Sequence, residues 1–235
     1  MSEAIAELGG IDLLVPCAAL TVYGSFEETP PEEFDRVVEV TFIGAVNIVR
    51  AVLPELERTG GAIVAAGSLM SKLPLPMLSS YSAAKHAERG FLNTLGIELR
   101  AAGSPVTVSI LHPGAIDTPV WDEMPTANGD LPRRPPYGHD PADVAEALVD
   151  LALRPRPEVT FGLETKAIEA LWQFSRPMGD FMLVAIQHYF QSGARTASSS
   201  VGAVRRAVER SVATDGLPMP VPLPRLPQQL ARLLR

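Results

Sequence analysis

Strand-like and helix-like segments alternate along the first two thirds of the chain, and this order limits the possible folds more than any other feature. Short apolar runs at residues 11–15, 62–66, 106–111 and 157–162 predict four strands. Segments with helical spacing separate them. Because strand–helix–strand units form right-handed crossovers, the order predicts an α/β fold with a parallel sheet covered by helices on both faces.

Helix boundaries and one long loop can also be predicted. Thr29-Pro30-Pro31-Glu32 predicts a helix with a threonine cap, a proline in its first turn and a glutamate in capping-box position. This helix should run to about residue 56 and end at Gly60-Gly61. Asp140 predicts the cap of a later helix. Residues 114–140, rich in proline, glycine and polar residues, predict a long loop, for which an active-site lid and simple disorder both stay open.

The last third of the chain predicts a different organisation. We expect residues 1–162 to hold the alternating elements and residues 163–235 to form a mainly helical extension with a proline-rich tail. An aromatic, amphipathic segment in this extension favours packing against the core, while a substrate lid or attachment to a membrane surface stays open. Its members are Trp172, Phe174, Phe181, Met182, Ile186, Tyr189 and Phe190. Five prolines between residues 216 and 227 favour an irregular strap or a disordered tail over a peptide ligand.

The composition is typical of a globular protein in a reducing compartment. Of the 235 residues, 46% are hydrophobic and 20% charged, and the net charge of -7 argues against nucleic acid as the main partner. We find no uninterrupted apolar run of membrane-spanning length and no signal peptide, so no membrane span and a cytoplasmic location are expected. Cys17 is the single cysteine, which excludes an internal disulfide. Its place at the end of an apolar strand predicts a buried, inert thiol.

Three polar side chains form the clearest candidate for a catalytic group. Tyr81 and Lys85 lie four residues apart, one turn of a helix, and Ser68 precedes Tyr81 by thirteen residues. A free tyrosine ionises near pH ~10, and a neighbouring ammonium lowers that pKa, which makes the phenol a usable general acid or base. The Ser68 hydroxyl can donate to an oxygen that gains charge in the transition state.

The predicted topology agrees with this chemistry. In parallel sheets the reactive groups gather beyond the carboxyl ends of the strands. Ser68, His112 and Pro113-Gly114 all lie at such ends. We therefore expect the serine, the helix that carries Tyr81 and Lys85, and the loop after the third strand to meet at one edge of the sheet.

Three segments together resemble the short-chain dehydrogenase/reductase family: Ser68, Tyr81-Ser82-Ala83-Ala84-Lys85, and Pro113-Gly114-Ala115-Ile116-Asp117-Thr118. They match in order and spacing over residues 9–162. The resemblance implies that the Ser68 and Tyr81 hydroxyls hold the substrate carbonyl, and that Tyr81 passes the proton while NAD or NADP passes the hydride. It also implies that Lys85 lowers the tyrosine pKa and binds the nicotinamide ribose.

The same resemblance implies which residues contact the cofactor. They are Tyr81, Lys85, Pro113, Gly114, Ile116 and Thr118. Ile116 would meet the nicotinamide carboxamide through its backbone, with Thr118 nearby on the carboxamide or the phosphates. The substrate pocket would be built from residues 69–80, the loop after Thr118 and the aromatic segment, which suggests a small apolar carbonyl or alcohol substrate. The choice between NAD and NADP is not indicated.

Two positions depart from the family pattern. Pro16-Cys17-Ala18-Ala19 stands where family members carry Asn-Asn-Ala-Gly, which removes two amides that brace the sheet and line the cofactor site. Thr41 stands at the position of a helix asparagine that belongs to a proton relay through water. A threonine hydroxyl can hold a water molecule but cannot copy an amide. Thr41 is therefore kept among the candidate catalytic residues.

The glycine-rich phosphate loop of the family is not found in this chain. Family members begin with a strand, that loop and about two βαβ units, on the order of 60 residues, before the part that matches. We therefore expect a truncated Rossmann-like sheet of about four strands, with a weakened hold on the cofactor pyrophosphate. The strand at residues 11–15 would then be an exposed apolar edge, which predicts a homo-oligomer or a partner polypeptide on that edge.

Two functions from different classes stay open. The first is an NAD(P)(H)-dependent oxidoreductase whose N-terminal half is truncated or supplied by a partner. The second is a catalytically silent relative that acts as a binding or assembly subunit, or a truncated gene product, without cofactor binding. A serine hydrolase is disfavoured because no Gly-x-Ser-x-Gly surrounds Ser68. No metal site is predicted, because the four histidines lack ligand spacing.

Overall fold

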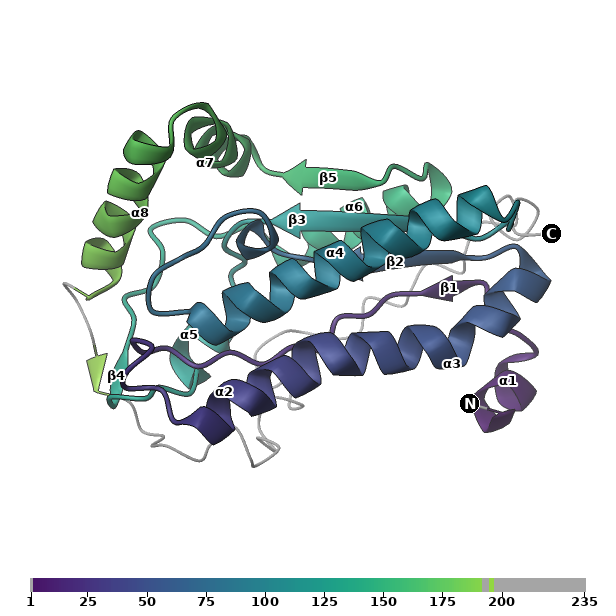
Figure 1. Ribbon diagram of the computed structural model, residues 1–235, viewed down its shortest axis with the longest axis horizontal. Coiled ribbons are helices and arrows are strands. Elements are labelled where there is room, and N and C mark those ends of the chain that lie inside the picture. Colours follow the sequence, from purple (N-terminus) through teal and green to yellow (C-terminus); the bar gives the residue numbers. More distant parts are fainter. Residues whose placement is uncertain (1, 192–194, 197–235) are drawn as a thin grey trace.

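A parallel sheet lies at the centre of the computed structural model, which describes residues 2–191 and 195–196 (Figure 1). The strand order is β1-β2-β3-β5, and each neighbouring pair is parallel. The strands are β1 Leu13–Leu14, β2 Ala62–Ala66, β3 Thr107–Pro113 and β5 Glu158–Phe161. The predicted α/β class and four-stranded parallel sheet are confirmed.

Helices cover both faces of this sheet. The long ones are α3 Gly44–Thr59, α4 Ser79–Ala101, α6 Pro141–Leu153, α7 Leu163–Phe174 and α8 Arg176–Gln191. Shorter elements are α1 Ser2–Leu8, α2 Pro31–Val38, the π-helical η1 Glu39–Ile43, the 3₁₀ turn η2 Leu69–Ser71, α5 Val120–Glu123, and the antiparallel pair β4 Asp130–Leu131 and β6 Arg195–Thr196. Figure 1 shows α3 and α4 along one side of the sheet, with the strand arrowheads pointing toward α5, β4 and α8.

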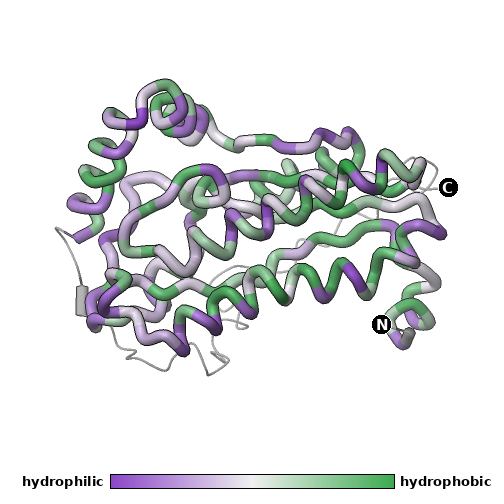
Figure 2. Tube along the Cα trace, in the orientation of Figure 1, coloured by the Kyte–Doolittle hydropathy of each residue, from purple (hydrophilic) through white to green (hydrophobic). Residues whose placement is uncertain are grey.

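Strand β2 illustrates why an unbroken apolar run forms the middle of the sheet. Ile63 packs on one side with Val52 of α3 and Leu92 of α4, and Val64 packs on the other side with Leu151 of α6. Alternate residues of a strand point to opposite faces, so a strand covered on both faces needs apolar residues at every position. Each such buried side chain contributes about 1.5–3 kcal/mol. Figure 2 shows the hydrophobic residues concentrated along the inner strands and α3.

The first strand is shorter than predicted. Only Leu13–Leu14 have strand geometry, and they pair with Ala62 and Ile63 of β2 alone among the described residues. The chain then continues without regular structure. Pro16 has no amide hydrogen with which to extend the ladder, although its carbonyl still accepts from the Ala66 amide at 3.2 Å. Cys17 follows Pro16 and is exposed, so the predicted buried thiol is wrong.

The predicted threonine cap is also wrong. Helix α2 begins at Pro31, its cap residue is Pro30, and no side chain caps it. The Thr29 hydroxyl instead donates to the Ser25 carbonyl at 2.8 Å, because the two prolines place Thr29 one residue too early to reach the first turn. The cap predicted for α6 is present, since the Asp140 carboxylate accepts from the Ala142 amide at 2.8 Å.

The helix predicted from residue 31 to about 56 consists of α2, η1 and α3, which follow one another without a break and end at Gly60 in the left-handed region. Within the described residues this stretch, Pro31–Thr59, is long enough to cross a membrane, and an 18-residue window inside it is apolar enough, with a mean hydropathy of 1.7. That differs from the expectation drawn from unbroken apolar runs. Val52 and other residues of its α3 part lie in the core beneath the sheet, and core helices have the same composition. The absence of a membrane span stays a prediction.

Helices α7 and α8 and the short strand β6 form the described part of the predicted C-terminal extension. Four members of the aromatic segment, Trp172, Met182, Ile186 and Phe190, pack against an apolar cluster at the carboxyl edge of the sheet. Phe174 and Phe181 are 87% and 76% exposed, so core packing holds for part of the segment only. The proline-rich tail lies outside the described residues.

Candidate active site

The carboxyl ends of β2 and β3 are joined to each other just before the candidate serine. The Gly67 amide donates to the Leu111 carbonyl at 2.8 Å, and His112 Nδ1 lies 3.1 Å from the Ser68 carbonyl oxygen. A Cβ on Gly67 would meet the side chains of Ile110 and His112, so glycine permits this close approach. The serine loop is thereby fixed to β3, as the predicted topology requires.

Ser68 begins the short turn η2 and is 8% exposed. Its Oγ accepts a hydrogen bond from the Met70 amide at 3.1 Å, while its own amide donates to Ser71 Oγ at 3.1 Å. These reciprocal bonds make a capping box. Because Oγ acts only as an acceptor here, its hydroxyl proton is still available to donate to another oxygen.

Tyr81 lies in the first turns of α4, half-buried, between two apolar clusters. The larger of these, which we name the Tyr81 cluster, contains buried residues from every segment expected to build a substrate pocket. They are Tyr23, Leu69, Leu73, Leu75, Leu78, Met124, Leu131 and Leu183, with Trp121, Ile168, Trp172, Met182, Ile186 and Phe190 packed against them. The three segments predicted to form the pocket therefore meet beside Tyr81.

Two polar residues in this region were missed by the sequence reasoning. Within the described residues, the buried hydroxyls of Tyr23 and Thr126 have no hydrogen-bond partner, although the two residues are only 4% and 1% exposed. Their backbones run side by side, with the Tyr23 amide donating to the Pro125 carbonyl at 2.9 Å. They come from loops after β1 and after β3, and no local pattern marked either of them.

Lys85 points into the protein. Its side chain is 2% exposed, and Nζ donates to the Ala66 carbonyl at 2.9 Å and to Glu88 Oε2 at 2.7 Å. Burial raises the pKa of the Glu88 carboxyl above its usual value, while the charge of Lys85 acts in the opposite direction. Glu88 was also missed, and the signal for it was an acid three residues after the lysine on one face of the helix.

Thr41 is fully buried in the middle of the π-helical segment η1. Its Oγ1 accepts from the Leu20 amide at 2.9 Å and donates to the Leu20 carbonyl at 3.2 Å. Both roles of the hydroxyl are thus used by one backbone residue of the loop after β1. Thr41 therefore holds that loop in place, and its hydroxyl proton is already donated to the Leu20 carbonyl.

The segment after β3, predicted to contact a cofactor, is held by its own neighbours. Gly114 packs so closely on Thr165 of α7 that a Cβ would overlap the threonine Oγ1. The Ile116 carbonyl accepts from Trp121 Nε1 at 2.8 Å, and the Asp117 amide donates to the His139 carbonyl at 3.0 Å. Pro113 ends β3, and Thr118 is half-buried.

A partly buried polar network ties α4 to β5 and to the serine loop. Glu158 accepts from Arg89 at 2.7 Å and from Asn93 at 2.5 Å, and its Oε2 lies 3.5 Å from His112 Nε2. Burial alone would raise the pKa of Glu158, but the close contact with His112 and the hydrogen bonds from Arg89 and Asn93 outweigh it and hold that pKa far below its usual range. Lys72, four residues after Ser68, lies 3.5 Å from the same carboxylate.

The network continues into the C-terminal extension. Lys72 Nζ donates to Thr160 at 2.9 Å and to Glu169 of α7 at 3.0 Å. Burial opposes ionisation of Glu169, yet hydrogen bonds from Thr160 and Lys72 bring its pKa below the usual value. Lys72 therefore connects the loop that follows the serine to the first helix of the extension.

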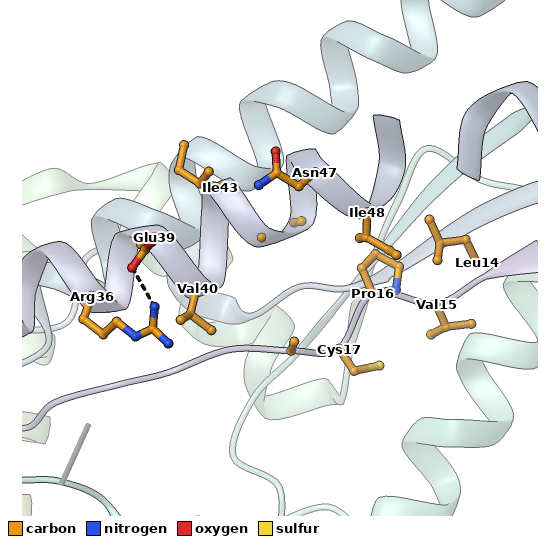
Figure 3. Close-up of a pocket in the computed structure, with 13 residues that line it drawn as sticks. Leu14, Val15, Pro16, Cys17, Arg36, Glu39, Val40, Ile43, Asn47 and Ile48 are labelled. Atoms are coloured by element: carbon orange, nitrogen blue, oxygen red, sulfur yellow. Dashed lines mark hydrogen bonds and ion pairs between the residues drawn. The ribbon is translucent and has the colours of Figure 1, made fainter. Parts of the chain in front are cut away.

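A groove of about 600 Å³ runs between β1 and the α2–η1–α3 helix (Figure 3). Its lining includes Val15, Cys17 and Ile43, and Arg36 and Glu39 form an ion pair of 2.6 Å at one end. Val15 and Ile43 are 37% and 41% exposed. The unpaired edge of β1 thus borders an apolar surface in the described part of the chain.

Comparison with known proteins agrees with this architecture. The profile of the short chain dehydrogenase family matches residues 1–129. SadH of Mycobacterium tuberculosis is 32% identical over 176 residues, which make up 71% of this chain and 63% of SadH. The chain spans less than two thirds of the length of the curated relatives that it matches.

Two solved structures share the fold. A short chain dehydrogenase from Burkholderia cenocepacia, in complex with NADP, is 27% identical with a TM-score of 0.66, over 77% of this chain and 72% of that chain. An alcohol dehydrogenase from the archaeon Thermococcus sibiricus, complexed with 5-hydroxy-NADP, is 28% identical with a TM-score of 0.58, over 68% and 66%. Since the family profile covers more than half of the residues and the parallel sheet agrees with it, this chain belongs to the short chain dehydrogenase family of oxidoreductases.

Proposed function

We propose that this chain carries the catalytic centre of an oxidoreductase that exchanges a hydride between NAD(P)(H) and a small apolar carbonyl or alcohol. The observation that carries the proposal is that Tyr81, on α4, packs against apolar residues from three separate segments at the carboxyl edge of the sheet. Ser68, in a loop held to β3 by His112, supports it. Membership of the family supplies the reaction type, and the residue roles are our assignment.

The side chains present suit the nicotinamide end of such a cofactor in part. Thr118 is half-buried, and the Ile116 carbonyl of the same segment bonds Trp121, which packs against the Tyr81 cluster. Lys85 fits less well, because its ammonium already bonds Ala66 and Glu88. Ile116 and Thr118 would hold the carboxamide, and Tyr81 and Lys85 the ribose. The Ile116 carbonyl keeps one lone pair beyond its bond with Trp121.

The chain's own residues would act on one substrate oxygen. The Ser68 hydroxyl donates to that oxygen and fixes its position, and the Tyr81 phenol gives or takes its proton. The Tyr81 cluster binds the apolar body of the substrate and keeps water away. A bound nicotinamide supplies or accepts the hydride at the carbonyl carbon.

A calorimetric titration with NADH and NADPH separately tests cofactor binding, and it also separates the two cofactors. We expect saturable heat for one of them, in the chain alone or in an assembly that completes the site. Tyr81→Phe should keep this binding and abolish turnover. Tyr137→Phe, at a tyrosine 55% exposed on the loop between β4 and α6, is the matched control and should keep both.

No heat up to millimolar cofactor, together with a Tyr81→Phe variant that changes stability alone, would instead support the silent binding or assembly subunit. A cytoplasmic location is part of the proposal. It rests on the composition, and fractionation of the source cells tests it.

A further inference from the structure

The Lys85–Glu88 ion pair is the most buried charged contact in the described part of the chain, and the proposed chemistry does not use its acid. The two side chains are 2% and 3% exposed, and Nζ and Oε2 are 2.7 Å apart. They lie three residues apart on α4, with Glu88 on the side of Lys85 away from Tyr81. A second bond joins the ammonium to the Ala66 carbonyl at 2.9 Å.

The Ala66 carbonyl is held in place by the sheet. Ala66 is the last residue of β2, and it pairs with Leu111 of β3 in the middle of the sheet. The helix likewise fixes the spacing between Lys85 and Glu88. An ammonium between two such anchors has two of its three N–H groups already bonded, so a ligand that accepts more than the third N–H must displace Glu88 or Ala66.

Glu88 also offsets the free-energy cost of burying the Lys85 ammonium. An ammonium taken out of water is strongly disfavoured unless an opposite charge and hydrogen bonds accompany it. Glu88 supplies the charge and one bond, and Ala66 supplies the other. Without the acid, the buried lysine would move toward solvent or give up its proton.

We propose that Glu88 is a positioning residue for Lys85, which holds the ammonium against the Ala66 carbonyl so that Lys85 can offer a ligand a second N–H only after it leaves Glu88. The identity of that ligand, a ribose diol, rests on the proposed function. The role of Glu88 in holding Lys85 in place does not depend on it.

The reactivity of the lysine amines measures this directly, because the chain has only three lysines, Lys72, Lys85 and Lys166. Brief acylation of the full chain with acetic anhydride, followed by mass spectrometry, gives a relative rate for each. Lys166 is exposed and serves as the reference. Lys72, bonded to Thr160 and Glu169, reports any general loosening.

Glu88→Gln keeps the shape and removes the charge, whereas Glu88→Asp keeps the charge. We expect Glu88→Gln to raise the Lys85 rate relative to Lys166 by roughly tenfold, with the Lys72 rate unchanged, because an uncompensated buried ammonium loses its charge readily. Glu88→Asp should restore a low rate. Glu55→Gln, which breaks the ion pair with Arg58 on α3, is the matched control and should leave Lys85 unchanged.

An unchanged Lys85 rate in Glu88→Gln would overturn the proposal. So would a parallel rise at Lys72, or an equal rise in Glu88→Asp, since either result indicates a purely structural role. If Glu88→Gln does not fold, the wild-type chain decides the question: the proposal requires Lys85 to react more slowly than both other lysines.

The calorimetric titration of Glu88→Gln with NADH and NADPH separates this inference from the proposed function. Severalfold tighter binding than in the wild type supports the release step, and unchanged saturable binding contradicts it. If neither protein binds either cofactor, the proposed function fails for this chain, and the acylation rates alone decide the role of Glu88.

Discussion

The Thr41 hydroxyl and the Leu20 backbone hold each other in both directions, with the amide of Leu20 donating at 2.9 Å and its carbonyl accepting at 3.2 Å. This reciprocal contact fastens the loop after β1 to the π-helical segment. Other residues of that loop, including Tyr23, line the Tyr81 cluster. A position expected to serve a proton relay therefore has a mechanical role in the structure.

Removing that hydroxyl should destabilise the fold. We expect Thr41→Val to lower the free energy of unfolding by about 1–2 kcal/mol, because two partly buried backbone groups of Leu20 lose their partner. Thr41→Ser keeps the hydroxyl and should cost less. Urea unfolding followed by circular dichroism measures both. Equal stability of Thr41→Val and the wild type would contradict the bracing role.

The Lys85–Glu88 pair should behave as a coupled unit in stability. Lys85→Met and Glu88→Leu should each cost about 3–5 kcal/mol, because each leaves one buried charge without its partner, whereas the double variant should recover most of the loss. A double-mutant cycle in urea gives the coupling energy. The exposed pair Arg36–Glu39 is the control, where the same cycle should give at most about 1 kcal/mol. Additive losses at Lys85 and Glu88 would exclude coupling.

Lowering the pH should reduce the free energy of unfolding, because Glu158 has a lowered pKa in the folded state. Its pKa in the folded state lies far below the usual value of 4.5, so the unfolded chain takes up the proton first as the pH falls. The stabilisation is therefore complete above about pH 4.5 and is lost progressively below it. Thermal unfolding from pH 7 to 3 should show Glu158→Gln less stable than the wild type at pH 7, with the difference shrinking toward pH 3. Glu98→Gln, an exposed change on α4, should leave the slope unaltered, and a constant difference for Glu158→Gln would refute the linkage.

Close packing of Gly114 on α7 predicts a compensating pair. Gly114→Ala should cost about 1–3 kcal/mol, because its methyl group would overlap Thr165 Oγ1. Adding Thr165→Ala should return part of the loss. As a control, Gly90→Ala on α4 meets no atom within 4 Å and should stabilise the helix by about 0.5–1 kcal/mol. A Gly114→Ala variant as stable as the wild type would show that α7 can shift freely.

The groove beside β1 should be an association surface. We expect sedimentation at micromolar concentration to detect an oligomer or a complex, since an apolar edge strand is a template for pairing. Ile43→Lys, at an exposed position of the groove, should weaken association while leaving unfolding unchanged. Phe174→Lys places the same charge on α7, at a residue outside the groove, and should have no such effect. A monomeric wild type would argue against the groove as an interface.

The fold was predictable because its signals are local. The apolar run 62–66 and the helical spacing of α4 can each be seen within a few residues, and the crossover rule then orders the strands. The cap of α6 was equally local. The cap of α2 failed because two consecutive prolines displaced Thr29, which a motif of residue types does not register.

In the candidate site, only the residues that belong to the serine–tyrosine–lysine motif were predictable from the sequence. Ser68 and the helix with Tyr81 and Lys85 lie at the predicted edge of the sheet, while their roles stay a proposal. Glu88 and Glu158 were not predicted because an acid at such positions is ordinarily solvated. Glu88 pairs with Lys85 on its own helix, so its spacing was visible but its burial was not, whereas Glu158 meets Arg89 from a distant segment. The exposure of Cys17 likewise depends on where β1 stops.

The π-helical turn Glu39–Ile43 has a geometric consequence for the helix that contains it. A π turn accommodates one residue more than an α turn, so everything that follows is rotated by about 100° relative to an even coil. Val37 of α2 and Val49 of α3 both lie inward with this offset in place. Deleting a single residue between 39 and 43 would restore the even coil, and one of the two halves would then turn its apolar side outward. The number of residues in the π turn, as well as their type, therefore decides which side chains of this helix face the core.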